Sequence, residues 1–474
     1  MVRKFGKPFI IYGIGTALVR FTSLFLVPVY TRVFSPLEYG VYDIITSLST
    51  LLYLFGMMQL ESGLARFYYE KKEDKERNNL INTLFSTVLS VSTFVAFFVI
   101  VFANPISSLL FQSNEYSWSI IYCALTIPAF NIYSFLSVLV RFEEKSVLFI
   151  IISTGQLLIM LSLSILLVVV LKFGLLGVFI SIFAGFAVAS VILIFHYKKL
   201  IKIEFNKSIL RELFKFSFPQ VPATLISWTN NYANRFVIAS YLTLTENGLY
   251  SAALKLGSVF LLIDTAIRMA WPPFFWKHFH ETNHREIFQK VFSRILLGVF
   301  VCFWLYAIFA KEVFQLVTPE SFWAATSLLG LIGISNVLFM ITNVVGMGPD
   351  IAKKTHFNIY FSLLALITNF ASLYFLLPIY GLLAVTVSVL LSNAVLLSAF
   401  WIFSEWVYYI GYSFKLFITY LFISLGTCLI IYYFDISFFI KLSAVLAVIL
   451  FVILFFKSQI MQTIKSLKLS KNKW

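Results

Sequence analysis

Seven ionisable side chains stand out deep within long apolar segments of this 474-residue sequence, and they are the residues best placed to do chemistry. A charge inside a membrane is costly to bury, so each one predicts either a functional site or a buried ion pair. They fall in only four segments, as Arg20, then Glu61 and Arg66, then Arg235, and finally Lys255, Asp264 and Arg268. This uneven placement predicts that the four segments line one shared polar cavity with a net positive charge.

Arg20 and Lys255 are the strongest candidates for a binding role, because neither has an acidic residue one turn away in its own segment. Arginine and lysine at mid-membrane suit an anionic group such as a phosphate or diphosphate. Arg268 has the simpler alternative of neutralising Asp264, four residues before it on the same expected helix. Glu61 lies close enough to the expected inner surface to contact the lipid headgroups instead of a cavity.

The run WTNNYANR (residues 228–235) is a second candidate site. At helical spacing it places Asn231, Asn234 and Arg235 on one face, with Trp228 and Tyr232 nearby. Aromatic and amide side chains together suit the hydroxyl groups of a sugar. The alternative is that these amides simply bond neighbouring helices, as Asn and Gln often do in membranes.

Composition places all of these residues in a membrane protein. Hydrophobic residues make up 60% of the chain, charged residues only 12%, and the mean hydropathy is +0.91. A soluble fold could not bury that much apolar surface, whereas a bilayer accepts it. We therefore expect an all-α polytopic membrane protein with about 14 transmembrane helices of about 20 residues each. The expected segments are 9–33, 40–67, 80–103, 117–140, 147–171, 174–195, 216–241, 248–272, 291–310, 322–346, 356–377, 381–403, 416–434 and 437–456.

Lysine and arginine are distributed very unevenly between the connections. With the N-terminus in the cytoplasm, 27 of the 36 lie in connections that face the cytoplasm and only 4 in connections that face outward. This asymmetry predicts that both termini are cytoplasmic. It also accounts for the net charge of +15, so no nucleic-acid partner is expected. The three cysteines are scattered singly, and we expect no metal site.

The chain also repeats itself. SPLEYGVYDIITSL (35–48) and TLTENGLYSAALKL (243–256) share Glu, Gly, Tyr and Leu at an offset of 208, and FGLLGVFIS (173–181) returns as YGLLAVTVS (380–388) at 207. An offset of six segments gives two lobes of the same orientation, related by an axis along the membrane normal. The expected divisions are an N-terminal six-helix lobe (1–197), a cytoplasmic linker (198–211), a C-terminal six-helix lobe (212–404), and two further helices with a basic tail (405–474).

The first copy of the repeat has the features of a tight turn. Pro36 and Gly40 are helix breakers, and Ser35 followed three residues later by Glu38 predicts a capping box at the start of the next helix. We expect the turn and its second copy (243–256) to mark where each lobe begins its cavity-lining hairpin. We do not expect either turn to form the binding site itself.

The opening GIGTALVRFTSLFLVPVYTRVFSPLEYGVYDIITSL, followed by GLARFYYE, resembles the polysaccharide transport family. That family contains the O-antigen and related lipid-linked oligosaccharide flippases of the multidrug/oligosaccharidyl-lipid/polysaccharide exporter superfamily. The resemblance implies a multi-pass protein of the bacterial inner membrane. Its function would be to flip undecaprenyl-diphosphate-linked oligosaccharide repeat units to the outer leaflet for surface polysaccharide biosynthesis, by alternating access.

The resemblance also implies partners, whereas the roles of individual residues are inferred from their depth and charge. The expected partners are the lipid-linked oligosaccharide, membrane lipids and other polysaccharide-assembly membrane proteins. No cofactor is expected beyond a coupling ion, H⁺ or Na⁺, for which Glu61 and Asp264 are the candidate carboxylates. The residues expected to hold the diphosphate and sugar of the substrate are Arg20, Arg235, Lys255, Arg268, Asn231 and Asn234.

Three other functions are weighed against this one. A structural scaffold without transport would not explain why buried charge is confined to matching helices of the two repeats. A cation-coupled multidrug exporter of the same fold is the nearest alternative, although the surplus of Arg and Lys disfavours cationic substrates. A membrane-embedded glycan polymerase or ligase would need a sizeable outer loop with catalytic residues, and every outer connection here is short. The sequence has neither a phosphate-binding Gly-x-x-x-x-Gly-Lys-Ser/Thr loop nor an Asp-x-Asp motif, so we predict that it is not an enzyme.

Overall fold

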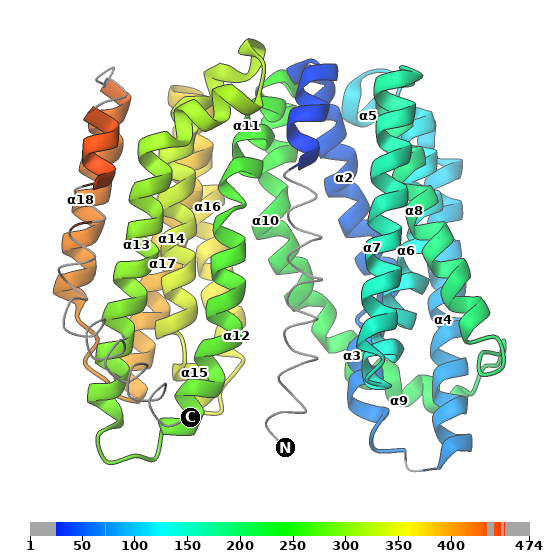
Figure 1. Ribbon diagram of the computed structural model, residues 1–474. Helices are drawn as coiled ribbons and strands as arrows, with labels where there is room; N and C mark the ends of the chain where they lie inside the picture. Colours follow the sequence, from blue (N-terminus) through cyan, green and yellow to red (C-terminus); the bar gives the residue numbers. More distant parts are fainter. Residues whose placement is uncertain (1–24, 72, 434–439, 447–449, 451–474) are drawn as a thin grey trace, which may run out of the picture. The chain divides into compact units, whose positions relative to one another are not determined.

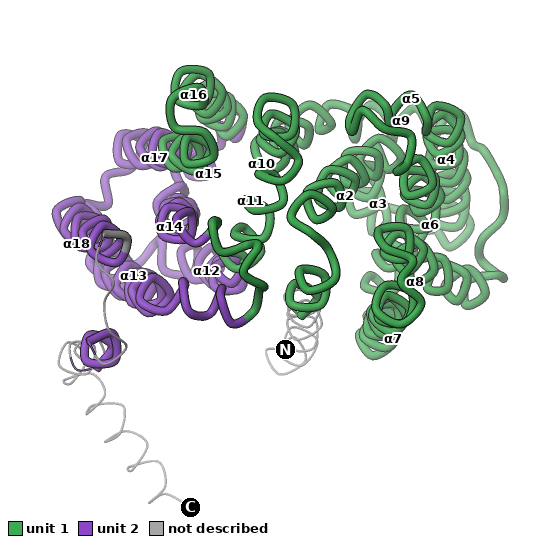
Figure 2. Tube along the Cα trace, turned by 90° about the horizontal axis from the view of Figure 1, so that it is seen from above, with its two compact units in different colours: residues 1–258, 317–325, 356–392 green, residues 259–316, 326–355, 393–474 purple. Residues whose placement is uncertain are grey.

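The computed structural model describes residues 25–71, 73–433, 440–446 and 450. Within these residues every regular element is a helix and none is a strand (Figure 1). The chain divides into two compact units, drawn in green and purple in Figure 2. The first unit comprises residues 1–258, 317–325 and 356–392, and the second comprises residues 259–316, 326–355 and 393–474.

The first unit contains most of the helices that position the candidate site. They are α2 (Pro36–Met57), α3 (Leu60–Phe67), α4 (Asp74–Val101), α5 (Ala103–Phe111), α6 (Ser117–Phe142), α7 (Ser146–Ser164) with a π-helical continuation (Ile165–Val170), α8 (Gly174–His196), α9 (Lys207–Ser217), a 3₁₀ turn (Phe218–Gln220), α10 (Val221–Tyr241), α11 (Leu244–Gly257) and α16 (Phe357–Tyr380).

Five of the helices in the described residues belong to the second unit, and the longest of them ends one residue beyond it. They are α12 (Phe260–His278), α13 (His284–Val317), α14 (Leu329–Val345), α15 (Gly348–Ile351) and α18 (Phe414–Tyr433). The boundaries between the units fall at 258/259, 316/317, 325/326, 355/356 and 392/393, so a 3₁₀ segment (Glu320–Leu328) and α17 (Leu382–Val407) are divided between them.

The prediction of an all-α polytopic membrane protein is confirmed. Among the described residues ten helices are long and apolar enough to span a membrane, or eleven if α11 and α12 form one span. Most expected segments agree with a helix to within a few residues; segment 117–140, for example, is α6. The expected first segment lies mostly, and the last largely, outside the described residues.

Three expected segments differ from the helices observed. Segment 248–272 is divided between α11 and α12, which are separated by Ser258 and Val259. Segment 40–67 is interrupted at Met58 and Gln59, which separate α2 from α3. Segment 216–241 forms α10, which is not among the ten helices apolar enough to span a membrane, because the polar run 228–235 lies within it.

The predicted capping box is confirmed at the start of α2. The Ser35 hydroxyl accepts a hydrogen bond from the Glu38 backbone N–H (3.3 Å), and the Glu38 carboxylate accepts one from the Ser35 backbone N–H (2.8 Å). The equivalent position in the second copy is Thr243, whose hydroxyl accepts a hydrogen bond from the Glu246 backbone N–H (3.1 Å) at the start of α11. Both copies of the repeat therefore begin a helix by the same capping chemistry.

The two copies of the repeat pack directly against each other. A Cβ atom added to Gly40 of α2 would lie 1.9 Å from the Leu244 carbonyl oxygen, and one added to Gly248 of α11 would lie 1.8 Å from the Pro36 carbonyl oxygen. Pro36 and Leu244 are themselves matched in the repeat, so the contact is symmetric. The backbones of α2 and α11 thus meet where only glycine fits, and the Asn247 amide adds a hydrogen bond to the Gly40 carbonyl (3.0 Å).

The connection between α8 and α9 lies along the N-terminal half of α4. Three of its backbone N–H groups donate to side chains of α4, at 3.0 to 3.2 Å; the pairs are Lys202 with Asn82, Glu204 with Ser86, and Asn206 with Thr83. Polar residues near the start of an otherwise apolar helix therefore have a structural role, since they satisfy the backbone of an extended segment. The expected division into lobes on either side of residues 198–211 stays a prediction.

Candidate functional site

A pocket of about 360 Å³ opens in the first unit between α2, α3, α6 and α10. Its lining combines aromatic rings with amide and hydroxyl groups. The aromatic residues are Tyr53, Phe130, Trp228 and Tyr232, and the polar residues are Thr50, Gln59, Glu61, Asn131, Ser134, Thr224, Ser227 and Asn231. Two residues expected from the sequence to bind ligands, Glu61 and Asn231, therefore line the same pocket.

The break between α2 and α3 shapes the floor of this pocket. Met58 and Gln59 both have positive φ values, of 48° and 58°, which non-glycine residues rarely adopt. The chain changes direction here, and Gln59 and Glu61 become part of the lining instead of continuing α2. Gly56 allows α6 to approach closely, since a Cβ atom there would lie 2.2 Å from the Asn131 amide nitrogen.

Two pairs of aromatic rings contribute to the lining. Tyr53 of α2 is stacked on Phe130 of α6, with ring centroids 4.2 Å apart. Trp228 of α10 is stacked on Tyr232, with centroids 5.9 Å apart. The Trp228 indole N–H donates to the Thr50 hydroxyl (2.9 Å), which fixes the ring against α2. Fixed aromatic faces between hydroxyl and amide groups are suited to a ligand with both apolar and hydroxylated surfaces.

Glu61 supplies the one acidic side chain of the pocket lining. The Ser134 hydroxyl donates to its carboxylate at 3.4 Å. Within the part of the chain that the structure describes, no lysine or arginine forms an ion pair with Glu61. A carboxylate in this setting can accept a cation or a proton from the pocket.

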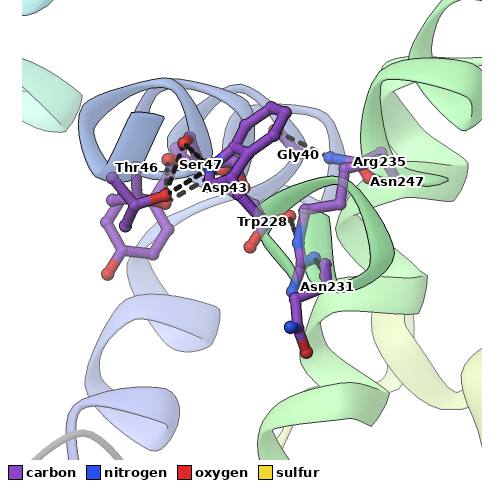
Figure 3. A network of polar contacts seen from close by, with 10 residues as sticks. Gly40, Asp43, Thr46, Ser47, Trp228, Asn231, Arg235 and Asn247 are labelled. Carbon is purple, nitrogen blue, oxygen red and sulfur yellow. Dashed lines mark hydrogen bonds and ion pairs between the residues drawn. The ribbon is translucent and has the colours of Figure 1, made fainter. Parts of the chain in front are cut away.

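Beyond the pocket, α10 leads to a buried cluster of charges shown in Figure 3. Arg235 lies 2.8 Å from the Asp43 carboxylate, and the two side chains are only 13% and 6% exposed. The Arg235 guanidinium also donates to the Asn231 carbonyl and lies over the Tyr232 ring, 4.9 Å from its centroid. Arg235 is thus joined to the pocket wall through α10 itself.

Lys255 of α11 adds a second cation to this cluster. It interacts electrostatically with both Asp43 and Arg235. The cluster therefore contains two cations and one carboxylate, and its net charge is +1 when all three are ionised. A surplus cation in a largely buried position is unfavourable unless an anion or water compensates it.

Asp43 was missed by the sequence reasoning, which assigned it to the turn before the second segment. Asp43 could have been recognised as a candidate, because it is an ionisable residue within the expected apolar segment 40–67. Its partner was not predictable, since Asp43 and Arg235 are brought together only by the packing of α2 on α10 and α11.

The neighbouring amides of α10 have different positions. Asn231 lines the pocket, with its amide donating to the Ser227 carbonyl one turn earlier (2.7 Å). Asn234 is buried and does not line the pocket; its side-chain oxygen accepts a hydrogen bond from Asn369 of α16 (2.8 Å). Of the two alternatives for these amides, the structure shows the helix-bonding one at Asn234.

Asp264 and Arg268 belong to the second unit and form the ion pair anticipated as the simpler alternative. Their charged atoms are 2.6 Å apart on α12, and the Asn343 amide donates to the other Asp264 oxygen (2.7 Å). Asp264 is 1% exposed, whereas half of Arg268 is exposed above the Phe339 ring. Arg20 lies outside the described residues.

A family model described as polysaccharide biosynthesis protein matches residues 29–327, which is more than half of the sequence. The chain belongs to this polysaccharide biosynthesis protein family. The pocket, the Asp43–Arg235–Lys255 cluster and the Asp264–Arg268 pair all lie inside the matched region.

The chain is also similar to the succinoglycan biosynthesis transport protein ExoT of Rhizobium meliloti. The two are 24% identical over 332 residues, which is 68% of this chain and 63% of ExoT. The match thus spans less than two thirds of that relative's own length.

Solved structures with the same fold are transporters and flippases. The lipid II flippase MurJ, in an inward closed conformation, has a TM-score of 0.78 at 14% identity, with 95% of this chain and 100% of MurJ covered. An inward-facing multidrug resistance MATE family transporter of the MOP superfamily has a TM-score of 0.61 at 12% identity, with 82% and 94% covered. At such identities the likeness shows a shared fold. The family match agrees with the resemblance to a polysaccharide transport family that the sequence predicts.

Proposed function

We propose that the protein flips undecaprenyl-diphosphate-linked oligosaccharide repeat units from the cytoplasmic to the outer leaflet of the bacterial inner membrane, for surface polysaccharide biosynthesis. The observation that carries this proposal is the aromatic and amide-lined pocket joined through α10 to a buried cluster with a surplus cation. Aromatic faces and amides suit sugar rings, and arginine and lysine suit a diphosphate. The family and its succinoglycan-transporting relative support the same class of substrate.

The described residues would contact different parts of the substrate according to their positions. Asn231 and the aromatic rings of the pocket would contact sugar, and Lys255 with Arg235 would attract the diphosphate. Binding an anion would compensate the surplus positive charge of the cluster. This compensation would favour binding, because the cluster without an anion holds an uncompensated charge in a largely buried position. Arg20 and Arg268 remain proposed diphosphate ligands on sequence grounds, and Glu61 and Asp264 remain proposed for H⁺ or Na⁺ coupling.

The symmetric crossing of α2 and α11 would act as a gate. The distribution of Lys and Arg assigns the capped ends of both helices to the outer face of the membrane. Alternating access requires that end to open while the inner end closes. Gly40 and Gly248 let the two backbones meet directly, and opening the gate would break the hydrogen bond from the Asn247 amide to the Gly40 carbonyl.

The proposal is tested in a strain that lacks the gene and is complemented with variants. We expect Lys255→Ala to lower surface polysaccharide by about tenfold or more, the effect of losing about 1.4 kcal/mol or more of binding, with lipid-linked intermediates accumulating. Lys290→Ala is the matched control, since Lys290 is a solvent-exposed lysine paired with Glu286. Normal polymer from Lys255→Ala at normal protein abundance would overturn the assignment of Lys255. Unchanged polysaccharide in the deletion strain would overturn the flippase itself.

A cation-coupled multidrug exporter of the same fold is the second candidate. The observation that favours it is the Glu61 carboxylate, which lines an aromatic pocket together with neutral polar groups. A cationic drug could stack on the rings and pair with that carboxylate. Increased drug sensitivity of the deletion strain, with unchanged polysaccharide, would favour this candidate over the flippase.

A further inference from the structure

A second cavity, of about 630 Å³, adjoins the polar pocket in the first unit. It is a groove between α2, α4 and the first turns of α10 with the preceding 3₁₀ turn. Every lining side chain is aliphatic, aromatic, methionine or proline, and none is charged. Four half-exposed phenylalanines contribute to its surface, namely Phe55, Phe94, Phe98 and Phe218. We refer to it as the apolar groove.

The apolar groove and the polar pocket share two walls. Leu54 of α2 lines both cavities, and the helix break directs Met58 into the groove and Gln59 into the pocket. On α10 the neighbours Thr224 and Leu225 divide in the same way, with the threonine in the pocket and the leucine in the groove. A single ligand can therefore lie across this boundary with a polar part on one side and an apolar part on the other.

We infer that the apolar groove binds the isoprenoid chain of the lipid-linked substrate while its glycan occupies the polar pocket. The inference rests on the proposed function and adds to it a site for the lipid. At ~30 Å³ per non-hydrogen atom, a rough figure taken from liquid water, the groove would hold about 20 such atoms, or about four five-carbon units. The half-exposed phenylalanines would be covered by that chain.

The position of the groove also indicates at which step of transport it would bind the isoprenoid chain. A chain in the groove places the diphosphate at the shared wall, near Gln59 and Thr224, whereas Arg235 lies further along α10. The groove would therefore hold the substrate as it loads, before the diphosphate reaches the cations. An acyl chain of a bulk phospholipid would match the apolar lining, but it has no glycan to place in the adjoining pocket.

Photo-cross-linking distinguishes the two occupants. Phe94 lines the groove and Phe97 does not, yet they lie on the same helix and are 62% and 61% exposed. Benzoylphenylalanine would replace each in turn in the full chain, in nanodiscs of phospholipid containing a few per cent of an undecaprenyl-diphosphate-linked oligosaccharide, which carries both the isoprenoid chain and a glycan for the pocket. We expect position 94 to give isoprenoid adducts enriched about tenfold over the mole fraction of that lipid, a preference of about 1.4 kcal/mol. Position 97 should give adducts in proportion to lipid composition.

A filling substitution provides the second test. Val95→Trp would occupy the groove, and Val101→Trp is the matched control on the same helix outside it. We expect Val95→Trp to abolish the enrichment at position 94 and to lower surface polysaccharide, while Val101→Trp leaves both unchanged.

The outcomes separate this inference from the proposed function. Adducts at position 94 that merely follow lipid composition would overturn the groove assignment, even if glycan export still depends on Lys255. Enriched adducts at position 94 in a protein whose deletion leaves polysaccharide unchanged would support the groove and overturn the flippase.

Discussion

The close crossing of α2 and α11 yields the sharpest prediction. In Gly40→Ala the new methyl group would lie 1.9 Å from the Leu244 carbonyl oxygen, whereas ordinary contacts lie at 3.4 Å or more, so the helices must separate by about 1.5 Å. Overpacking of this kind costs about 1–3 kcal/mol. We expect Gly40→Ala and Gly248→Ala each to lower the thermal stability of the purified protein.

The double variant adds a test of the geometry itself. Both methyl groups push the same pair of backbones apart. Once one substitution has separated the helices, the second substitution should therefore cost less free energy than it does alone. We expect a favourable coupling of about 0.5–3 kcal/mol in a double-mutant cycle, measured from the unfolding of the four proteins in one detergent.

Two other glycines serve as controls for the substitution. A Cβ atom at Gly155 or Gly298 would have no neighbour within 4 Å, although both residues lie within long helices. Alanine is a better helix former than glycine, so these variants should be neutral or more stable by up to about 1 kcal/mol. If Gly40→Ala proved as mild as Gly155→Ala, the backbone contact between α2 and α11 would be refuted.

Three further predictions concern the site. Asn234→Ala should lower the free energy of unfolding by about 1–3 kcal/mol, because it leaves the Asn369 amide of α16 buried without a hydrogen bond. Asn231→Ala should leave the melting temperature unchanged and reduce polysaccharide export. Equal melting temperatures for the two variants would contradict this contrast. Arg235→Gln should cost less than the about 3–5 kcal/mol of a buried ion pair that loses one partner, because Lys255 still compensates Asp43. Asp43→Asn, which leaves two cations together, should cost more in the same unfolding assay, and the reverse order would contradict the assignment of Lys255 to the cluster. Glu61→Gln should make transport in proteoliposomes insensitive to an imposed H⁺ or Na⁺ gradient, and a gradient response equal to that of the unaltered protein would exclude Glu61 as the coupling group.

Features that depend on neighbours in sequence were predictable. The helix positions follow from runs of apolar residues, and the capping box from the spacing of Ser35 and Glu38. The Asp264–Arg268 pair follows from a separation of four residues on one helix. Each of these needs only the geometry of a single helix, which the sequence determines closely.

Features that depend on helix rotation and packing were not predictable. Asn231 and Asn234 are three residues apart and hence only about 60° apart around α10. A small difference in rotation decides that the first faces the pocket and the second faces α16. The ion pair of Asp43 with Arg235 joins residues almost 200 positions apart, and nothing local to either indicates the other.

The internal repeat shows which features are shared between its two copies, residues 35–48 and 243–256, and which belong to one copy. Gly40 and Gly248 occupy matched positions, because a symmetric backbone crossing constrains both helices equally. The charges do not match: Asp43 corresponds to Ser251, and Lys255 corresponds to Ser47. A substrate whose two ends differ, lipid on one side and glycan on the other, requires an asymmetric site inside a nearly symmetric frame. Chemistry differs between the copies at the charged cluster, while the crossing that would have to open and close is the same in both.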